Sequence, residues 1–379
     1  MRIKEFHVEG LNGQTSFTLS FNDDLNLLTG RNGSGKTTVL KLIWYMISGN
    51  IERILPEIRF RRARLDTESF TLILTQREPD KADRAGVLLG WSFLQKGTDE
   101  DKGSTTGIET PRLRSLNAKI SMLAGSSIFF PTFRRIEGGF SMARGQPREP
   151  DDLWMAVRAA GIEASMTGMA KMLSVRKHRF VASISTNDIV SSLTSHYANV
   201  SEQLNVDHRE LSSDIIDEIK QHDDQAQLET VQADALNLSH KTLDSIREQV
   251  KIHLQKQEQL LKPFTSLSDL IVRIFKHKGI RVTARLAFGE TAGAIASEQL
   301  SAGEKQMLSF LVYNAFEDQS VIFIDEPEIS LHVDWQRQLF PTLLEQGSTN
   351  QFIVATHSPF IYTRYVDKEL VLHPDKGEG

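Results

Sequence analysis

The chain has 379 residues, of which 40% are hydrophobic and 25% charged, and its formal net charge is −5. This composition is that of a globular protein, and the slightly acidic balance gives no overall basic field for nucleic acid or an anionic membrane. Because the sequence contains no cysteine, disulfides, thiolate zinc sites, iron–sulfur clusters and cysteine nucleophiles are excluded.

The length predicts two to three domains, or one large domain with an insertion. The first ten residues, MRIKEFHVEG, carry charges at Lys4 and Glu5 and have no apolar core, so we expect no secretory signal. Apolar runs stay well below the ~18–20 residues that span a bilayer. We therefore expect a cytoplasmic protein with no membrane partner.

Hydrophobic residues alternate near the N-terminus, which predicts two short strands of a hairpin or meander around 3–8 and 17–21. The mostly apolar run at 25–29 predicts a buried strand. A glycine-rich turn follows, and then an apolar helix with Val39, Leu40, Ile43, Trp44 and Ile47 on one side.

The next part of the chain has the pattern of paired strands at 69–76 and 86–94. Segment 97–107 is polar and rich in glycine, so we expect an exposed loop there. Segment 126–133 predicts a buried strand that ends at Pro131.

The middle of the chain, from about Asp151 to Pro263, has few glycines or prolines and a helical pattern. Leucine, isoleucine and valine recur at spacings of three, four and seven, which predicts two amphipathic helices in an antiparallel pair. A polar, acidic connection at 222–227 would join them. At ~1.5 Å per residue, each helix would reach about 40–50 Å.

Strand character returns at 281–288, and strands are expected at 320–324, 351–355 and 369–372 with helices between them. This alternation predicts a mostly parallel sheet. We therefore expect three regions: an N-terminal half of an α/β domain at 1–140, a helical insertion at 141–264, and the C-terminal half at 265–379.

The segment after the first buried strand matches G-x-x-x-x-G-K-[ST] at every position. Its glycines let successive N–H groups point at phosphate oxygens, and the helix N-terminus adds partial positive charge. We expect Lys36 to reach the β- and γ-phosphates of ATP and Thr37 to bind Mg²⁺. The residues expected to hold the nucleotide are Gly30, Arg31, Asn32, Gly33, Ser34, Gly35, Lys36, Thr37 and Thr38.

A pair of acidic residues follows the apolar run at 321–324. The carboxyl ends of strands are where α/β sheets bind ligands. We therefore expect Asp325 to hold Mg²⁺ and Glu326 to act as general base on the attacking water.

The predicted helix before this strand begins near residue 301, and its start permits two interpretations. Ser301 and Glu304 have the S-x-x-E spacing of a capping box, with which any helix can begin. A helix N-terminus with a hydroxyl and the flanking Gly303 is also an anion site that suits a γ-phosphate. His357, after the strand at 351–355, is likewise either a polar loop residue or a phosphate ligand.

The loop at 30–37, the run LSAGEKQ at 300–306, the Asp-Glu pair and His357 together resemble the ABC-class ATPases of the SMC, RecF and OLD lineage. The resemblance covers roughly 1–140 and 265–379. It implies an α/β P-loop ATPase head, with a mostly parallel sheet and an N-terminal antiparallel part, interrupted by a helical or short coiled-coil insertion.

The resemblance also implies roles for residues. Lys36, Glu326 and His357 would act in catalysis, while Ser301, Gly303 and Glu304 would contact nucleotide held by a second copy, so that ATP joins two heads into a dimer. The string EPEISLH at 326–332 looks like the RecF/OLD-like branch rather than membrane transporters. The string FFPTFRRIE at 129–137 is similar to a segment of ATPase subunits of bacterial anti-phage systems, including Septu-type and retron-associated ones.

The sequence departs from the lineage in two places. No glutamine follows the strand before the insertion, where Pro131-Thr132-Phe133-Arg134 stands instead, and Gln76 is a weak substitute. The chain ends about 20 residues after His357, whereas OLD nucleases continue into an acidic nuclease domain. We therefore expect no nuclease within this chain.

Three functions are open from the sequence. The first is a sensor ATPase of a defence system that controls a separate nuclease or toxin subunit. The second is a repair or chromosome-maintenance ATPase that binds DNA directly, and the third is a scaffold without turnover, which the intact Glu326 argues against. Basic runs, notably Arg61 and Arg62 and the pair Arg134 and Arg135, are either solvated faces or contacts for DNA, RNA or a protein partner.

Overall fold

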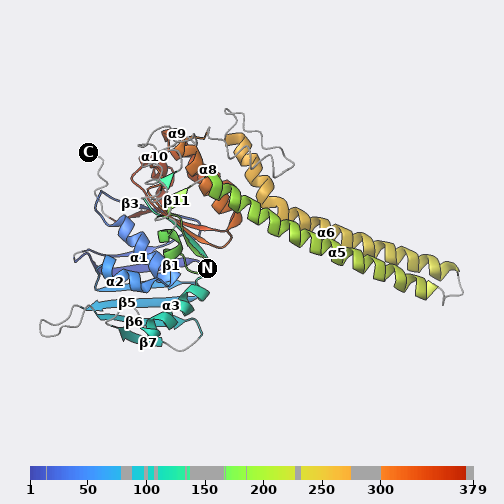
Figure 1. Ribbon diagram of the computed structural model, residues 1–379, viewed down its shortest axis with the longest axis horizontal. Helices are drawn as coiled ribbons and strands as arrows, with labels where there is room; N and C mark the ends of the chain where they lie inside the picture. Colours follow the sequence, from blue (N-terminus) through green and yellow to red (C-terminus); the bar gives the residue numbers. More distant parts are fainter. Residues whose placement is uncertain are drawn as a thin grey trace, which may run out of the picture. The chain divides into compact units, whose positions relative to one another are not determined.

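The computed structural model describes residues 1–13, 15–77, 88–97, 101–105, 110–132, 135–136, 166, 168–184, 186–226, 232–274 and 300–372 (Figure 1). The chain divides into two compact units. The first comprises Met1–Ser185 and Glu298–Gly379, and we refer to it as the head. The second comprises Thr186–Ser297.

One layer of the head is a six-stranded antiparallel sheet in the order β2-β1-β4-β5-β6-β7. The predicted N-terminal hairpin is present, with Phe6 opposite Leu19, and so are the paired strands β5 and β6. The strands are β1 (Ile3–Leu11), β2 (Thr15–Ser20), β4 (Arg62–Thr67), β5 (Phe70–Arg77), β6 (Leu88–Gln95) and β7 (Asp101–Thr105).

The prediction of an exposed loop at 97–107 is wrong for Asp101–Thr105, which form β7 and pair with β6 at the edge of this sheet. Asp101, Lys102 and Gly103 have low strand propensity, so the sequence gives little sign of a strand. Gly103 has a packing reason, because a Cβ there would lie 2.2 Å from the ring of Trp91. The glycine makes room for a large side chain on the neighbouring strand.

The second layer is a six-stranded parallel sheet in the order β10-β8-β12-β13-β3-β14. All residues of β3, β8, β12 and β13 are buried. Because these strands are parallel, their carboxyl ends meet at one edge of the sheet. The strands are β3 (Leu25–Thr29), β8 (Ser127–Phe130), β10 (His178–Phe180), β12 (Val321–Asp325), β13 (Gln351–Ala355) and β14 (Glu369–Val371).

Helix α1 (Lys36–Ser48) lies in the core of the head. Its side chains are buried on most sides, and they belong to the same hydrophobic cluster as residues of both sheets. Trp44 is the largest fully buried side chain, and its Nε1 donates to Ser127 Oγ at 3.1 Å. The other helices of the described head include α3 (Pro111–Leu123), α8 (Ala302–Phe316), α9 (Val333–Glu345) and the short α10 (Pro359–Tyr362).

The structure divides the chain differently from the boundaries expected at 141–264. The segment His178–Phe180 pairs with Ser127–Phe129 as the edge strand of the parallel sheet, so it belongs to the head. His178 is completely buried, and burial lowers its pKa to about 4. A neutral imidazole there bonds Ser127 Oγ through Nδ1 at 2.8 Å, which ties β10 to β8.

The second unit contains the predicted helix pair, α5 (Thr186–Ala226) and α6 (Gln232–Ile274), which run side by side (Figure 1). The helices have 41 and 43 residues, about 60 Å each and longer than expected. Helix α6 continues past Pro263, and α5 continues through most of the connection expected at 222–227. Lys256 bonds Asp207 across the pair at 2.8 Å.

The strand expected at 281–288 lies outside the described residues. Within the part that the structure describes, we find no helix that is both long and apolar enough to cross a membrane.

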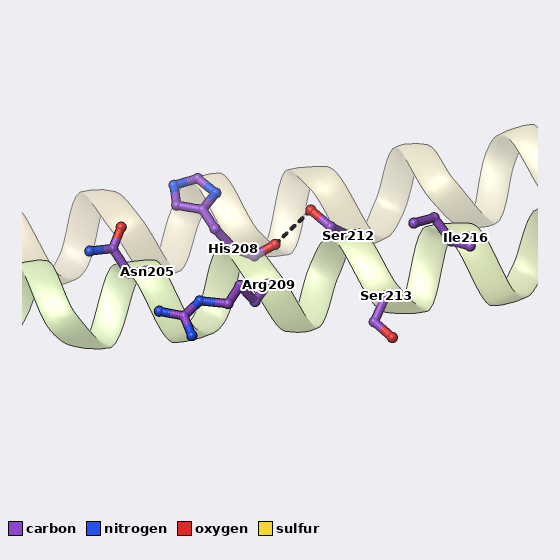
Figure 2. Close-up of a pocket in the computed structure, with 6 residues that line it drawn as sticks. All are labelled: Asn205, His208, Arg209, Ser212, Ser213 and Ile216. Carbon is purple, nitrogen blue, oxygen red and sulfur yellow. Dashed lines mark hydrogen bonds between the residues drawn. The ribbon is translucent and has the colours of Figure 1, made fainter.

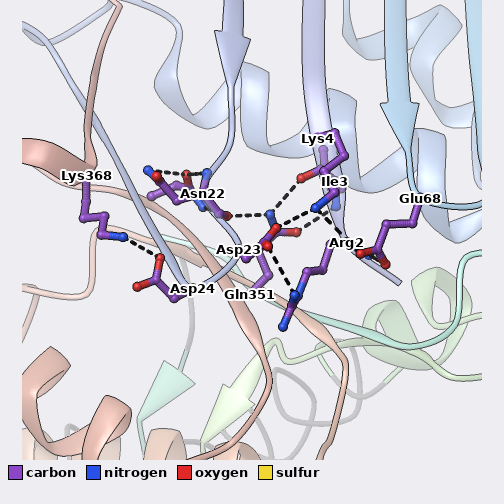
Figure 3. A network of polar contacts seen from close by, with 10 residues as sticks. Arg2, Ile3, Lys4, Asn22, Asp23, Asp24, Glu68, Gln351 and Lys368 are labelled. Carbon is purple, nitrogen blue, oxygen red and sulfur yellow. Dashed lines mark hydrogen bonds and ion pairs between the residues drawn. The ribbon is translucent and has the colours of Figure 1, made fainter.

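Gln351 joins the two sheets of the head (Figure 3). Its side chain is fully buried; Oε1 accepts the Ile3 N–H, while Nε2 donates to the carbonyls of Ile3 and Asn22, all at 2.8 Å. One amide at the start of a parallel strand thereby satisfies two backbone groups of β1 and one of the segment between β2 and β3. Exposed ion pairs of Asp23 with Arg2 and Lys4 surround it.

We expect Gln351→Leu to lower the free energy of unfolding by about 2–4 kcal/mol, because buried backbone groups lose their partners. Asp23→Ala, in the same network but exposed, should cost less than about 1 kcal/mol. Urea unfolding of both variants measures the difference. Equal losses would contradict the importance of the buried amide.

Candidate functional site

The loop between β3 and α1 has the backbone of a phosphate cradle. Gly33 and Gly35 adopt φ of +82° and +91°, a region that favours glycine. Helix α1 begins at Lys36, and the first N–H groups of a helix have no acceptor within it. Ser34 Oγ is buried in this loop without a hydrogen-bond partner. These unused donors fit the oxygens of a phosphate chain.

Lys36 is held inside this loop. Its Nζ donates to Gly30 O at 2.7 Å and to Arg31 O at 3.2 Å, and it lies 3.4 Å from Nδ1 of His357. The side chain is 5% exposed. Burial lowers the pKa of Lys36, while the carboxylates of Glu326, Asp325 and Glu328 oppose that shift. The ammonium is therefore placed where it would meet phosphate charge.

Asp325, the last residue of β12, meets two hydroxyls. Thr37 Oγ1 donates to Asp325 Oδ1 at 3.1 Å, and Thr132 Oγ1 donates to Oδ2. Carboxylate and hydroxyl oxygens are ligands that Mg²⁺ accepts, so Asp325 and Thr37 fit a site for this ion. Mg²⁺ bound there would neutralise phosphate charge.

Thr132 is a site residue that the sequence analysis missed. It follows β8, and Phe130 of β8 pairs with Ile324 of β12, so the residues after the two strands are neighbours. Thr132 stands in the segment where the lineage usually has a glutamine. Gln76, the weak substitute, is used elsewhere: its amide bonds the backbone of Ile58 and Phe60.

Glu326 lies directly after Asp325 in an uncommon backbone conformation, with φ of +49°. Its N–H donates to Ala355 O at 2.8 Å, which fixes the turn. Burial raises the pKa of Glu326, and Asp325 and Glu328 add to that effect. A carboxylate with a raised pKa accepts a proton more readily, as a general base must.

His357 contacts both Lys36 and Glu326. Its Nε2 lies 3.9 Å from Glu326 Oε1. Burial and the Lys36 ammonium lower the pKa of His357, so a neutral imidazole is favoured. The residues after β3, β12 and β13 thus converge: the structure brings Lys36, Thr37, Asp325, Glu326 and His357 together.

Ser301, Gly303 and Glu304 form the start of α8 and belong to a different group of contacts. The capping box is complete: Ser301 N–H donates to Glu304 Oε2 at 2.7 Å, and Glu304 N–H donates to Ser301 Oγ at 3.4 Å. In the part of the chain described, the Ser301 hydroxyl bonds only Glu304 and not the loop at 30–37. The start of α8 packs instead on the segment after Glu326, where Gln306 Nε2 donates to Pro327 O at 2.7 Å.

The basic runs are partly neutralised. Arg61 and Arg62 are exposed on or beside β4, and Arg61 pairs with Glu9 at 3.0 Å. Arg179 pairs with Glu317 at 3.2 Å. Arg134 and the side chain of Arg135 lie outside the described residues.

The helical unit has a surface hollow of about 520 Å³ along α5, lined by Asn205, His208, Arg209, Ser212, Ser213 and Ile216 (Figure 2). Figure 2 shows that all these residues come from one helix. None of the predicted site residues lines it.

Two family models match the chain. One, described as "AAA domain, putative AbiEii toxin, Type IV TA system", matches residues 164–363, which is more than half of the chain. The other, described as "AAA ATPase domain", matches residues 1–85. Between them, the matches include the loop at 30–37, the start of α8, Asp325, Glu326 and His357.

The chain is also similar to parts of curated proteins. Septu protein PtuA of Bacillus thuringiensis is 36% identical over 74 residues, which are 19% of each protein. Endonuclease GajA of Bacillus cereus is 36% identical over 119 residues, 30% of this chain and 18% of GajA. The DNA replication and repair protein RecF of Shewanella pealeana is 30% identical over 87 residues, 23% of this chain and 24% of RecF. The similarity thus spans less than a quarter of each relative's length.

Gly303→Ala tests the packing of α8. A Cβ at Gly303 would lie 2.4 Å from Ser330 O, a backbone atom that cannot move aside cheaply. We expect a loss of about 1–3 kcal/mol in the free energy of unfolding. Gly168→Ala is the matched control, because a Cβ there meets nothing within 4 Å. A Gly303→Ala protein as stable as the control in urea would refute this contact.

Proposed function

The chain belongs to the AAA-domain family whose model matches residues 164–363, and it resembles the SMC/RecF lineage. We propose that it binds and hydrolyses ATP with Mg²⁺ and associates into a dimer around the nucleotide. One observation carries the proposal: Lys36, Thr37, Asp325, Glu326 and His357 meet at the carboxyl edge of the parallel sheet, beside a loop with unused phosphate donors.

Each of these side chains has a role in that chemistry. Lys36 and the loop N–H groups bind the phosphates, while Thr37 and Asp325 hold the metal ion. Glu326 takes the proton of the attacking water, and its raised pKa favours that step. The neutral His357 lies within reach of both Lys36 and Glu326 and orients the terminal phosphate.

The position of Ser301 outside the group of proposed catalytic residues supports the dimer. Ser301 caps its own helix and makes no described hydrogen bond to the loop at 30–37. In the lineage that the sequence resembles, this serine meets nucleotide held by the opposite copy. Its hydroxyl at an N-terminus of a 15-residue helix suits that contact.

Glu326→Gln should lower kcat for ATP hydrolysis by at least about 100-fold, because the general base is lost. ATP binding should persist, so the protein should accumulate as a dimer with ATP and Mg²⁺. Sedimentation velocity with and without ATP measures the dimer fraction. Adding Ser301→Arg should return the protein to monomer, and Lys36→Ala is the control that cannot bind nucleotide. Equal dimer fractions with and without ATP would sink the dimer proposal.

We further propose that the ATPase acts as a sensor or regulator of a separate effector, a nuclease or toxin subunit, in anti-phage defence. The similarity to PtuA and GajA supports this role, as does the resemblance of FFPTFRRIE at 129–137. The alternative is a DNA-repair ATPase that binds DNA directly. It is supported by the similarity to RecF and by the exposed Arg59, Arg61, Arg62 and Arg64 on or beside β4.

Native mass spectrometry of tagged Glu326→Gln protein, purified with ATP and Mg²⁺ from its own host, separates the two roles. We expect a dimer with a stoichiometric second protein. A dimer that carries nucleic acid and no second protein would favour the repair role instead. Charge reversal at Arg61 and Arg62 should then abolish that nucleic acid.

A further inference from the structure

One carboxylate joins the segment after β12 to the segment after β13. Glu328 Oε1 accepts the backbone N–H of His357 at 2.6 Å, and Glu328 Oε2 accepts the hydroxyl of Thr356 at 2.9 Å. Both oxygens are therefore used, and the side chain is half-buried. Hydrogen bonds to an ionised acceptor are about twice as strong as neutral ones. This fork fixes the backbone from which the His357 ring projects.

The same segment also contacts the start of α8. Gln306 of α8 donates to Pro327 O, and Gly303 approaches Ser330 O so closely that no Cβ fits between them. Residues 327–330 thus contact both the start of α8 and the backbone of His357. His357 in turn lies beside Lys36 Nζ and Glu326.

We propose that Glu328 is a positioning residue that couples the start of α8 to His357. Contacts that Ser301 makes with a second copy would thereby change the position of the histidine. This inference rests on the proposed ATPase activity and adds its regulation. The charge of Glu328 raises the pKa of Lys36 and Glu326 from a distance, whereas its two hydrogen bonds hold Thr356 and the His357 backbone.

Substitutions at Glu328 distinguish positioning from a general loss of structure. Glu328→Ala removes both acceptors, and we expect kcat to fall about 10–100-fold. KM for ATP should change less than about threefold, because the Lys36 hydrogen bonds in the loop go to Gly30 O and Arg31 O and not to Glu328. Glu328→Gln keeps an oxygen for the His357 N–H, so its kcat should fall less than about fivefold. Glu317→Gln is the matched control: that carboxylate bonds Ser320 and Arg179 just before β12, at the opposite edge of the sheet.

Amide hydrogen exchange gives a second readout that does not need turnover. The His357 N–H should exchange at least about tenfold faster in Glu328→Ala, since it loses its acceptor. The Thr356 N–H, which donates to Leu28 O, should keep its protection. Uniformly faster exchange at both amides would show local unfolding and overturn positioning.

The two proposals fail separately. If the wild type hydrolyses ATP and Glu328→Ala has an unchanged kcat, the positioning inference is wrong and the ATPase stands. If the wild type shows no turnover, the ATPase proposal is wrong, and the exchange of His357 alone decides whether Glu328 holds its backbone. Unchanged exchange at that amide would overturn the inference in either case.

Discussion

The burial of charge at one edge of a parallel sheet is the constraint on which the head depends. Asp325 is 1% exposed and Lys36 is 5% exposed, and each needs polar partners at a place where three strands end. Hydroxyls from Thr37 and Thr132 serve the carboxylate, while carbonyls of the loop serve the ammonium. Unpaired, such charges would be costly, and the head supplies their partners from its own hydroxyls and carbonyls.

At the same edge, the end of β12 and the segment after it contribute to several parts of the site. It provides Asp325 and Glu326 for the proposed chemistry, and it provides Glu328 for the backbone of His357. Two residues later, Ser330 packs on Gly303 of α8. A stretch of six residues, 325–330, thereby links the proposed metal ligand, the proposed general base, the backbone of His357 and the start of α8.

Sequence reasoning identified the core motifs because each depends on local order: a buried strand, then glycines and Lys36, or a buried strand, then Asp325 and Glu326. It missed Thr132 and Glu328, whose roles exist only because β8, β12 and β13 are neighbours in space. It also missed β7, where Gly103 and serine carry no strand signal, and β10, because His178 reads as a charged residue until its burial is known. The helix lengths expected from the sequence were too short, because α6 continues past Pro263.

The order of strands also bears on how the protein is made. In the described sheet, β3 pairs only with β13 and β14, and Asn26 bonds Phe352, which is 326 positions later. At ~10 residues per second, a ribosome needs about 30 s to synthesise that interval. Until then the strand before the phosphate loop has no sheet neighbour on either edge, and unpaired edges invite wrong partners. The strand before the phosphate loop therefore gains its sheet neighbours only after β13 and β14 have been synthesised.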